Sequence, residues 1–346
     1  MKHLATALRN KLENAVKAAR DIAEEAARTS LEQLGVPLKD KPSYLDDAQA
    51  ALRNRLRAHG RQLGDVRSPD GSQEIRHLIV ETAYEHWHRM LFTRFLAENN
   101  LLMHTDGVPV SLEDCEELAH DENALDGWEL AGRYASRMLP QIFRKDSPVL
   151  QLHLAPEHQK QLEKLLAGLD NEIFRASDSL GWVYQFWQAK KKDEVNRSEV
   201  KIGADELPAV TQLFTESYIV NFLLDNSLGA WWAARRLSDR DLKETETEEE
   251  LRTKVSLPGV PLEYLRFVRR EDGRWTPAAG TFDGWPEYLS ELKVLDPCCG
   301  SGHFLVAAFM MLVPMRMELE NLSAQNAVDA VLRDNLHGLE IDQRCV

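Results

Sequence analysis

The twelve residues Val294–Leu305 read VLDPCCGSGHFL and decide the fold of the second half of the chain. A short apolar run reaches an acid, Asp296, and the glycines Gly300 and Gly302 then open an apolar helix. Glycine permits positive φ angles and lets a ligand approach the backbone closely. The N–H groups at the start of such a helix favour nucleotide-like ligands. The stretch therefore predicts a strand (292–295), a ligand-binding turn and a helix.

A second strand is predicted at 336–341, reading LHGLEI, with Glu340 near its end. An acid at that position accepts hydrogen bonds from ribose hydroxyls, and Ile341 is then placed against an adenine face. The separation from Asp296 exceeds the roughly twenty residues that are usual in dinucleotide folds. We expect the excess to form two helices, 302–319 and 323–335.

Composition limits the class of protein. The 346 residues suffice for two domains with sizeable cores, and a hydrophobic fraction of 43% is typical of a soluble protein. The net charge of -14 argues against coating nucleic acid by bulk charge, but leaves room for a local basic groove. No run approaches the length of a membrane span, no signal-peptide core is visible, and four cysteines make no disulfide scaffold. A cytoplasmic protein without membrane contact is predicted.

The first part of the chain is predicted to be helical. Ser72 is a favourable N-cap for a helix whose apolar residues recur every four positions from Ile75 to Phe95, a spacing typical of a core face. Further helices are expected at 1–32, 46–61, 112–120, 128–138 and 157–169. Downstream, the charge-dense segment 238–254 predicts a solvated helix end or linker, and 262–268 with 274–276 predicts a hairpin.

Three other patterns have a functional and a structural interpretation. His86 and His88 flank Trp87, but residues two apart on a helix do not face each other, so we expect no metal site. The aromatic stretch 181–187 before three lysines suits single-stranded nucleic acid, yet a buried aromatic helix face is favoured. Asp193 with 199–201 loosely resembles a nuclease metal motif, and a solvated loop is favoured there.

The string DPCCGSGHF at 296–304 resembles motif I of amino-methylating DNA methyltransferases, and GLEID at 338–342 resembles their acidic second motif. Upstream, TQLFTESYIV at 211–220 is similar to the family's additional S-adenosylmethionine motif, in the order of adenine-specific enzymes. The strings LDNSLG (224–229) and GWVYQ (181–185) sharpen a resemblance to the large methyltransferases of the BREX (PglX-like) and DISARM phage-defence systems.

We therefore expect an α/β protein with two domains. The residue pattern predicts a mainly α-helical N-terminal domain at 1–200, and the resemblance implies that 201–346 begin a Rossmann-like S-adenosylmethionine-dependent methyltransferase domain with an incomplete parallel sheet. It also implies a cofactor site. The expected cofactor-binding residues are Phe214 and Thr215 on the methionine side, Asp296, Pro297 and Cys298 at the pocket floor, Gly300, Gly302 and Phe304 in the turn and helix, Glu340 at the ribose and Ile341 at the adenine.

The family's Pro-Pro-aromatic motif, which holds the flipped adenine, is absent, since the sequence contains no Pro-Pro. We therefore assign no catalytic residue and no metal site, and expect an N-terminal portion, a split gene product or a disrupted one that is inactive alone. The predicted parent enzyme transfers methyl from S-adenosylmethionine to adenine N6 in double-stranded DNA, in phage defence or restriction-modification, with other defence subunits as candidate partners.

Two alternatives remain open from the residues. The first alternative is that the chain is a non-catalytic DNA- or partner-binding module of a defence complex. The second alternative is that the parent enzyme methylates RNA, protein or a small molecule, because one fold serves many acceptors.

Overall fold

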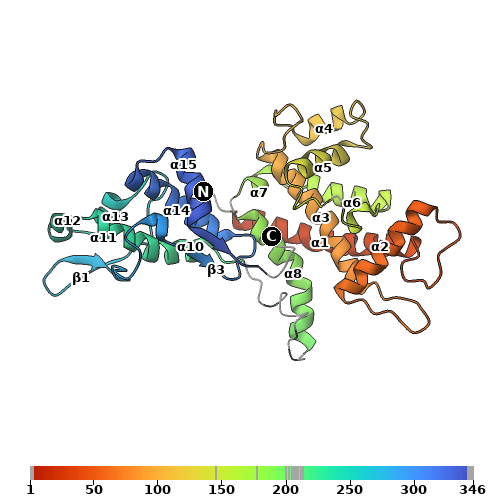
Figure 1. Ribbon diagram of the computed structural model, residues 1–346, viewed down its shortest axis with the longest axis horizontal. Coiled ribbons are helices and arrows are strands. Elements are labelled where there is room, and N and C mark those ends of the chain that lie inside the picture. Colours follow the sequence, from red (N-terminus) through yellow and green to blue (C-terminus); the bar gives the residue numbers. More distant parts are fainter. Residues whose placement is uncertain are drawn as a thin grey trace. The chain divides into compact units, whose positions relative to one another are not determined.

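The computed structural model describes residues 4–144, 146–176, 178–198, 201, 203, 210 and 214–340. The chain divides into two compact units, Met1–Val210 and Thr211–Val346, called unit 1 and unit 2 below (Figure 1). Among the described residues, no helix has both the length and the apolar character that crossing a membrane requires.

Unit 1 is helical, as predicted. Its long first helix packs against α3, α6 and α8 (Figure 1). The elements are α1 (Thr6–Gln33), α2 (Asp47–Leu63), α3 (Arg76–Glu98), α4 (Leu112–Leu118), α5 (Gly127–Met138), the 3-10 turn η1 (Val149–Gln151), α6 (Pro156–Ala167), α7 (Asn171–Arg175) and α8 (Ser179–Ser198).

The expected N-cap of α3 is wrong. The helix begins at Arg76, and Ser72 lies in the preceding loop, where its N–H and hydroxyl donate to the Asp70 carboxylate. The buried carboxylate of Asp65, eleven residues ahead of the helix, instead accepts from the N–H groups of His77 and Leu78 at 2.8 and 3.1 Å. A carboxylate distant in the sequence therefore accepts hydrogen bonds from the free N–H groups of the first helical turn. N-cap rules that consider only adjacent residues do not predict this.

The core faces of α3 and α8 follow the predictions. On α3 the side chains of Ile79, Ala83, Trp87 and Leu91 are buried. On α8 the aromatic residues Trp182, Phe186 and Trp187 are buried, which confirms the structural interpretation of that stretch. The solvated loop expected at the nuclease-like pattern is wrong at Asp193, which lies exposed within α8, because that helix extends to Ser198. Glu199 lies outside the described residues.

Unit 2 combines short helices with two small sheets. Its elements are α10 (Ser217–Leu224), the π-helical turn η2 (Asp225–Gly229), α11 (Ala230–Arg236), α12 (Asp239–Glu244), α13 (Glu248–Val255), β1 (Phe267–Arg269), β2 (Trp275–Pro277), η3 (Leu289–Glu291), β3 (Val294–Asp296), α14 (His303–Glu320), α15 (Ala324–Asp334) and β4 (Leu336–Gly338).

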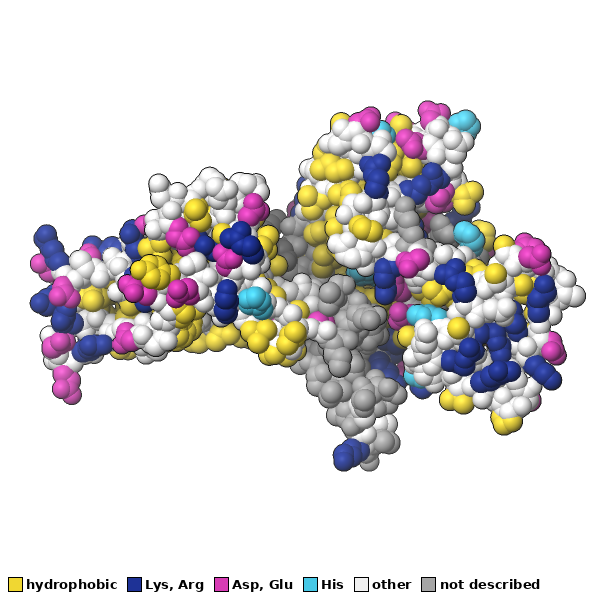
Figure 2. All heavy atoms as spheres, viewed as in Figure 1, with side chains coloured by type: hydrophobic (Ala, Val, Ile, Leu, Met, Phe, Trp, Pro, Cys, Tyr) yellow, Lys and Arg dark blue, Asp and Glu magenta, His cyan; other side chains and the backbone are white. Residues whose placement is uncertain are grey.

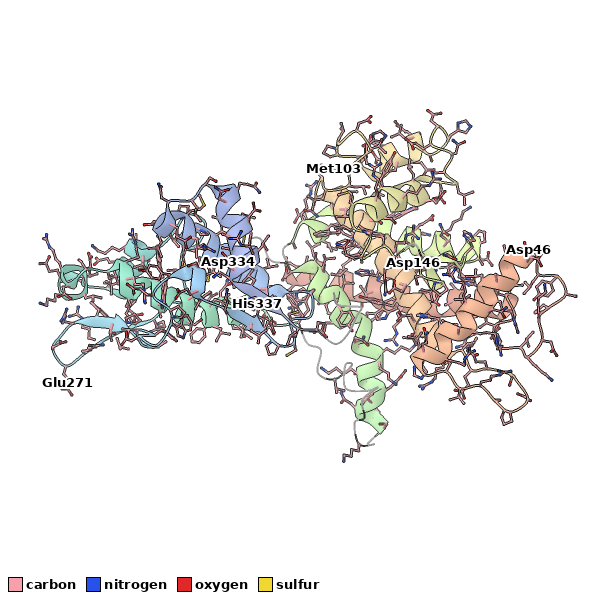
Figure 3. All side chains as sticks on the ribbon, viewed as in Figure 1. Asp46, Met103, Asp146, Glu271, Asp334 and His337 are labelled. Carbon is pink, nitrogen blue, oxygen red and sulfur yellow. The ribbon has the colours of Figure 1, made fainter. Side chains whose placement is uncertain are left out.

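The charge-dense segment forms two helices, so the linker alternative is wrong, whereas α12 buries no residue and fits the expected solvated helix. Its two helices are capped by Ser238 and Thr247, and α13 buries Leu251 and Val255 in the core of unit 2. The predicted hairpin is confirmed: β1 and β2 pair antiparallel, with Glu271 at the turn (Figure 3).

Strands β3 and β4 pair in parallel, with Val294 opposite Leu336 and Asp296 opposite Gly338. Helices α14 and α15 form the crossover between them, as expected from the long separation, and bury Leu312, Met315 and Val331. On the other face Leu295 is 57% exposed. Parallel sheets are normally covered on both faces. The described part of unit 2 therefore contains a two-stranded parallel sheet that is covered by helices on one face.

Candidate functional site

The Gly-x-Gly turn joins β3 to α14. Gly300 and Gly302 have φ angles of 54° and 82°, and Gly302 is the N-cap of α14. The Cys298 N–H donates to the Asp296 carboxylate at 3.2 Å, and the Gly302 N–H donates to the Cys299 carbonyl at 2.8 Å. The left-handed backbone explains why glycine occupies both positions.

Space above this turn is open. A Cβ atom placed on Gly300 or Gly302 meets no heavy atom within 4 Å. Neither glycine is therefore required by crowding within the described residues. The arrangement leaves backbone accessible to a ligand at the end of a parallel strand, where ligands bind in open α/β sheets.

The acid of the second motif lies at the same turn. The Gly300 N–H donates to the Glu340 carboxylate at 2.8 Å. Two backbone bonds fix this approach, from the Cys299 N–H to the Leu339 carbonyl at 3.0 Å and from the Leu339 N–H to the Asp296 carbonyl at 2.9 Å. The structure thus brings together the glycine turn and the acid.

A third glycine serves the packing beneath the turn. A Cβ atom at Gly338 would lie 2.9 Å from both Cys299 Sγ and Leu305 Cδ1. Only a residue without a side chain lets β4 approach the turn so closely. Sequence reasoning did not assign this role, although Gly338 stands at the start of the second motif.

The upstream motif also reaches this region. The Phe214 ring lies 4.6 Å from the His303 ring, centroid to centroid, at an interplanar angle of 45°. Thr215 precedes α10, and α10 packs against α14. Phe304 packs against the hydrophobic core of unit 2 while half-buried. Pro297 lies exposed in the turn. Ile341 lies outside the described residues.

A buried polar network supports β3 and β4. The fully buried Asn335 side-chain amide donates to the carbonyls of Leu289 and Leu292 at 2.6 and 2.8 Å, and the Asn335 backbone carbonyl accepts from the Val294 N–H at 2.8 Å. Arg316 on α14 donates to the side chains of Asn335 and Asp334, which lie just before β4. Sequence reasoning missed this network, because its partners are remote in the chain.

Two side chains of the LDNSLG string hydrogen-bond to the loop that precedes β1. The Asp225 carboxylate accepts from the Tyr264 N–H at 2.9 Å, while the Asn226 amide donates to the Tyr264 carbonyl at 2.8 Å and accepts from the Arg266 N–H at 3.1 Å. Burial raises the pKa of Asp225 to about 6. This part of the pattern has a structural explanation within unit 2.

The cysteines and histidines have ordinary surroundings. Burial and the charges of Asp296 and Glu340 raise the pKa of the Cys299 thiol, which disfavours the nucleophilic thiolate. His86 contacts the Val149 carbonyl at 2.9 Å, and His88 stacks on neighbouring aromatic rings of α3. A search of the described residues for three or more His, Cys, Asp or Glu side chains placed to bind a metal found none.

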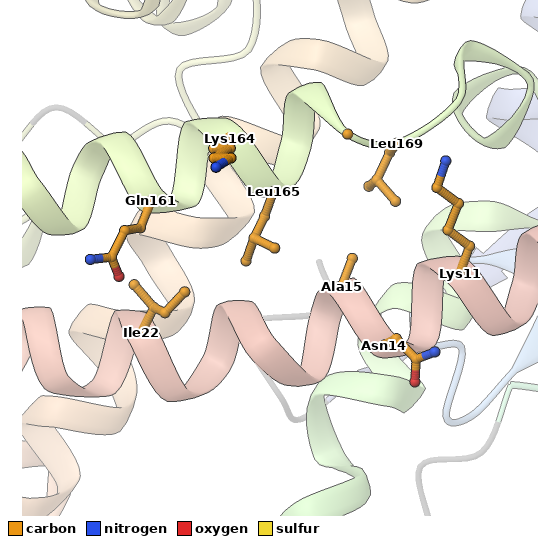
Figure 4. Close-up of a pocket in the computed structure, with 9 residues that line it drawn as sticks. Lys11, Asn14, Ala15, Ile22, Gln161, Lys164, Leu165 and Leu169 are labelled. Atoms are coloured by element: carbon orange, nitrogen blue, oxygen red, sulfur yellow. The ribbon is translucent and has the colours of Figure 1, made fainter.

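A cavity of about 510 Å³ lies in unit 1 between α1 and α6 (Figure 4). Ala15, Ile22, Leu165 and Leu169 form its apolar walls, with Lys11 and Lys164 also lining it. Lys11 pairs with Asp170 at 2.8 Å. None of the residues of the three methyltransferase-like motifs lines this cavity, so we do not assign the cofactor to it.

Comparison with known proteins gives a family match at the turn and the second strand. Residues 281–346 match the family described as "MmeI, DNA-methyltransferase domain". The chain is 27% identical over 335 residues to the adenine-specific methyltransferase PglX of Lacticaseibacillus casei (strain Zhang), covering 85% of this chain and 26% of that protein.

Two further relatives match shorter regions. The adenine-specific methyltransferase BrxX of Escherichia coli O9:H4 (strain HS) is 32% identical over 195 residues, 55% of this chain and 14% of that protein. A putative type II restriction enzyme and methyltransferase of Methanocaldococcus jannaschii is 23% identical over 221 residues, 59% of this chain and 18% of that protein.

The chain thus spans about a quarter or less of the length of these relatives. The matches include the glycine turn, the acid and, for PglX, most of the helical unit as well. They confirm that this chain resembles the PglX-like adenine-specific methyltransferases.

Proposed function

We propose that unit 2 binds S-adenosylmethionine at the Gly300–Gly302 turn, as part of an adenine-specific DNA methyltransferase. The observation that carries the proposal is the 2.8 Å hydrogen bond from the Gly300 N–H to the Glu340 carboxylate. This bond joins the glycine turn to the acidic second motif at the end of a parallel strand. In the family that the chain resembles, both motifs bind the same cofactor. The open space above both glycines supports the same proposal.

Each residue has a role in this proposal. Gly300 and Gly302 admit the cofactor to the backbone, and the Glu340 carboxylate accepts from its ribose hydroxyls. Phe214 and Thr215 close the methionine side, and Asp296 with Pro297 and the Cys298 backbone shapes the floor. Phe304, packed on the core, holds the start of α14 in place, and Ile341 faces the adenine. When bound, the cofactor supplies an electrophilic methyl group.

The wider activity belongs to the proposal too. The parent protein methylates adenine N6 in double-stranded DNA, in phage defence or restriction-modification, and further strands beside β3 and β4 form a Rossmann-like sheet whose helices cover the exposed face at Leu295. Base extrusion and amine orientation fall to a Pro-Pro-aromatic motif that this sequence does not contain. The residues of this chain therefore bind and orient the donor.

Calorimetric titration of the chain with S-adenosylmethionine tests the cofactor site. The Glu340→Gln variant keeps an acceptor for the Gly300 N–H but removes the charge, and a hydrogen bond to a charged group contributes about 1.5–3 kcal/mol. We expect affinity to fall roughly tenfold or more. The exposed Glu291→Gln is the control, with unchanged affinity. No binding by the unaltered chain, or equal affinity of Glu340→Gln, would contradict the proposal.

A further inference from the structure

Segment 39–77 of unit 1 carries eight lysines and arginines against six acids, a positive excess on a chain with a net charge of -14. It covers α2 and the loops on either side, and among the described residues none of its lysines or arginines forms an ion pair. These are Lys39, Lys41, Arg53, Arg55, Arg57, Arg61, Arg67 and Arg76. Elsewhere in unit 1, cations such as Arg133 and Lys190 are paired with acids at 2.9 and 2.7 Å.

Three of the six acids of this segment accept hydrogen bonds from N–H groups, and the other three are Asp40, Asp47 and Glu74. Asp65 is buried and binds the first turn of α3. Asp70 accepts from the N–H and hydroxyl of Ser72, and Asp46 accepts from the Gln49 N–H at 2.7 Å as the N-cap of α2. The charges of these three acids are directed at backbone dipoles and not at the neighbouring cations, whereas the charge of Asp40 opposes the lowering of the Arg53 pKa.

Two buried arginines make the segment rigid. Arg53 donates to the carbonyls of Gly35 and Leu38, and Arg57 donates to those of Val36, Leu38 and Gly71. Burial lowers the pKa of Arg57, and the positive charges of Arg53, Arg67 and Arg61 lower it further. Arg53, Arg57 and Arg61 follow at four-residue spacing on α2, which places them on one face of the helix. Like charges held together in this way fit an anionic ligand.

The remaining cations of the segment are exposed. We define the arginine patch as Lys39, Lys41, Arg55, Arg61, Arg67 and Arg76, all of which face solvent. Figure 2 shows Lys and Arg side chains gathered over this end of unit 1, at the lower right of the view. The patch stands out on a chain whose net charge is -14.

We propose that the arginine patch binds the phosphate backbone of duplex DNA. Guanidinium groups match phosphate oxygens bidentately, and local positive charge supplies sequence-independent affinity for DNA. Single-stranded nucleic acid also requires aromatic stacking platforms. The segment offers one exposed aromatic residue, Tyr44, whose hydroxyl donates to the Gln33 carbonyl. The choice of DNA rests on the proposed function, but the patch belongs to a different unit from the cofactor site.

Fluorescence anisotropy with a labelled 30-base-pair duplex of arbitrary sequence tests the patch, without cofactor and over a range of salt concentrations. We expect the triple variant Arg61→Gln, Arg67→Gln, Arg76→Gln to bind at least tenfold more weakly. The slope of log affinity against log salt should fall by up to about 2.7, since each lost phosphate contact removes about 0.9. Arg67→Glu alone, which reverses one exposed charge, should weaken binding in the same direction if the triple variant does not fold.

The control is Arg28→Gln, Arg137→Gln, Lys160→Gln, which removes the same charge from exposed positions elsewhere on unit 1. An equal loss in this control attributes binding to bulk charge and overturns the proposal. Unchanged affinity of both patch variants overturns it, as does tighter binding of polyglutamate than of duplex, which identifies an acidic protein as the partner. The Glu340→Gln variant should bind duplex DNA with unchanged affinity. The proposal for the arginine patch and the proposal for the cofactor site can therefore fail independently of each other.

Discussion

At the residue scale, glycine is required at neighbouring positions of the site for different physical reasons. Gly300 and Gly302 adopt positive φ in open space, whereas Gly338 is confined by Cys299 and Leu305. The motif string predicted the first two as ligand-approach positions. The third required the register of β4 against the turn, which is a tertiary property.

Replacing Gly338 by alanine should destabilise unit 2 by about 1–3 kcal/mol, because the added Cβ overlaps two side chains packed beneath the turn. Urea unfolding measures the change. Gly284→Ala is the control, since a Cβ atom there meets nothing within 4 Å and should leave stability nearly unchanged. Equal stability of the two variants would show that the contact at Gly338 relaxes without cost.

At the element scale, apolar spacing predicted where helices lie better than where they begin. The stripe of α3 is buried as expected, yet the helix starts four residues after Ser72 because Asp65 binds its first N–H groups. For the charge-dense segment 238–254, local composition likewise did not predict the helix α13. That helix depends on Leu251 and Val255 entering a core formed by distant residues.

The buried His88 on α3 predicts that the folded state loses stability in acid. Burial and the charge of Arg144 lower the pKa of His88 to about 4, below the unfolded value of about 6.5. The native state therefore binds fewer protons, and this stabilising contribution, present above pH 6.5, is lost as pH falls toward 4. His88→Phe cannot titrate and keeps the stack between Tyr84 and Phe92.

Between pH 7.5 and pH 4.5, His88→Phe should lose less stability than the unaltered chain, by on the order of 1–2 kcal/mol. Urea unfolding at the two pH values measures the difference. The fully exposed His120→Gln should behave like the unaltered chain. A His88→Phe variant with the full pH response would contradict the assignment.

At the scale of the whole molecule, each unit has its own hydrophobic core, one around α3 and α5 and one around α11 and α14. A change in one core should therefore alter that unit's unfolding and leave the other unchanged. Asp225 permits this test, because burial raises its pKa to about 6, opposite in sense to His88.

A carboxyl with a raised folded pKa contributes stability below its unfolded pKa of about 3.8, and loses it as pH rises through about 6. Asp225→Asn keeps an oxygen for the Tyr264 N–H and avoids the buried charge. Relative to the unaltered chain it should gain on the order of 1–2 kcal/mol between pH 4.5 and pH 7.5.

Peptide-resolved hydrogen exchange in urea measures this gain separately for each unit. It should appear in unit 2 and leave unit 1 unchanged. The exposed Asp329→Asn is the control and should show no pH-dependent gain. A gain spread over both units would show that they unfold together.

The sequence by itself determined the local features: the helices of unit 1, the hairpin, the parallel strands β3 and β4, the two-helix crossover, and the motifs that resemble an adenine-specific methyltransferase. These follow from periodicity, glycine chemistry and short strings, which act between near neighbours. Only the tertiary structure decided that Glu340 contacts Gly300, that Gly338 is confined, and that Asn335 and Arg316 hold the strands. It also decided that the cations of the arginine patch form no ion pair with an acid among the described residues. Those features depend on residues far apart in the chain, whose distances and burial are fixed when the two cores form.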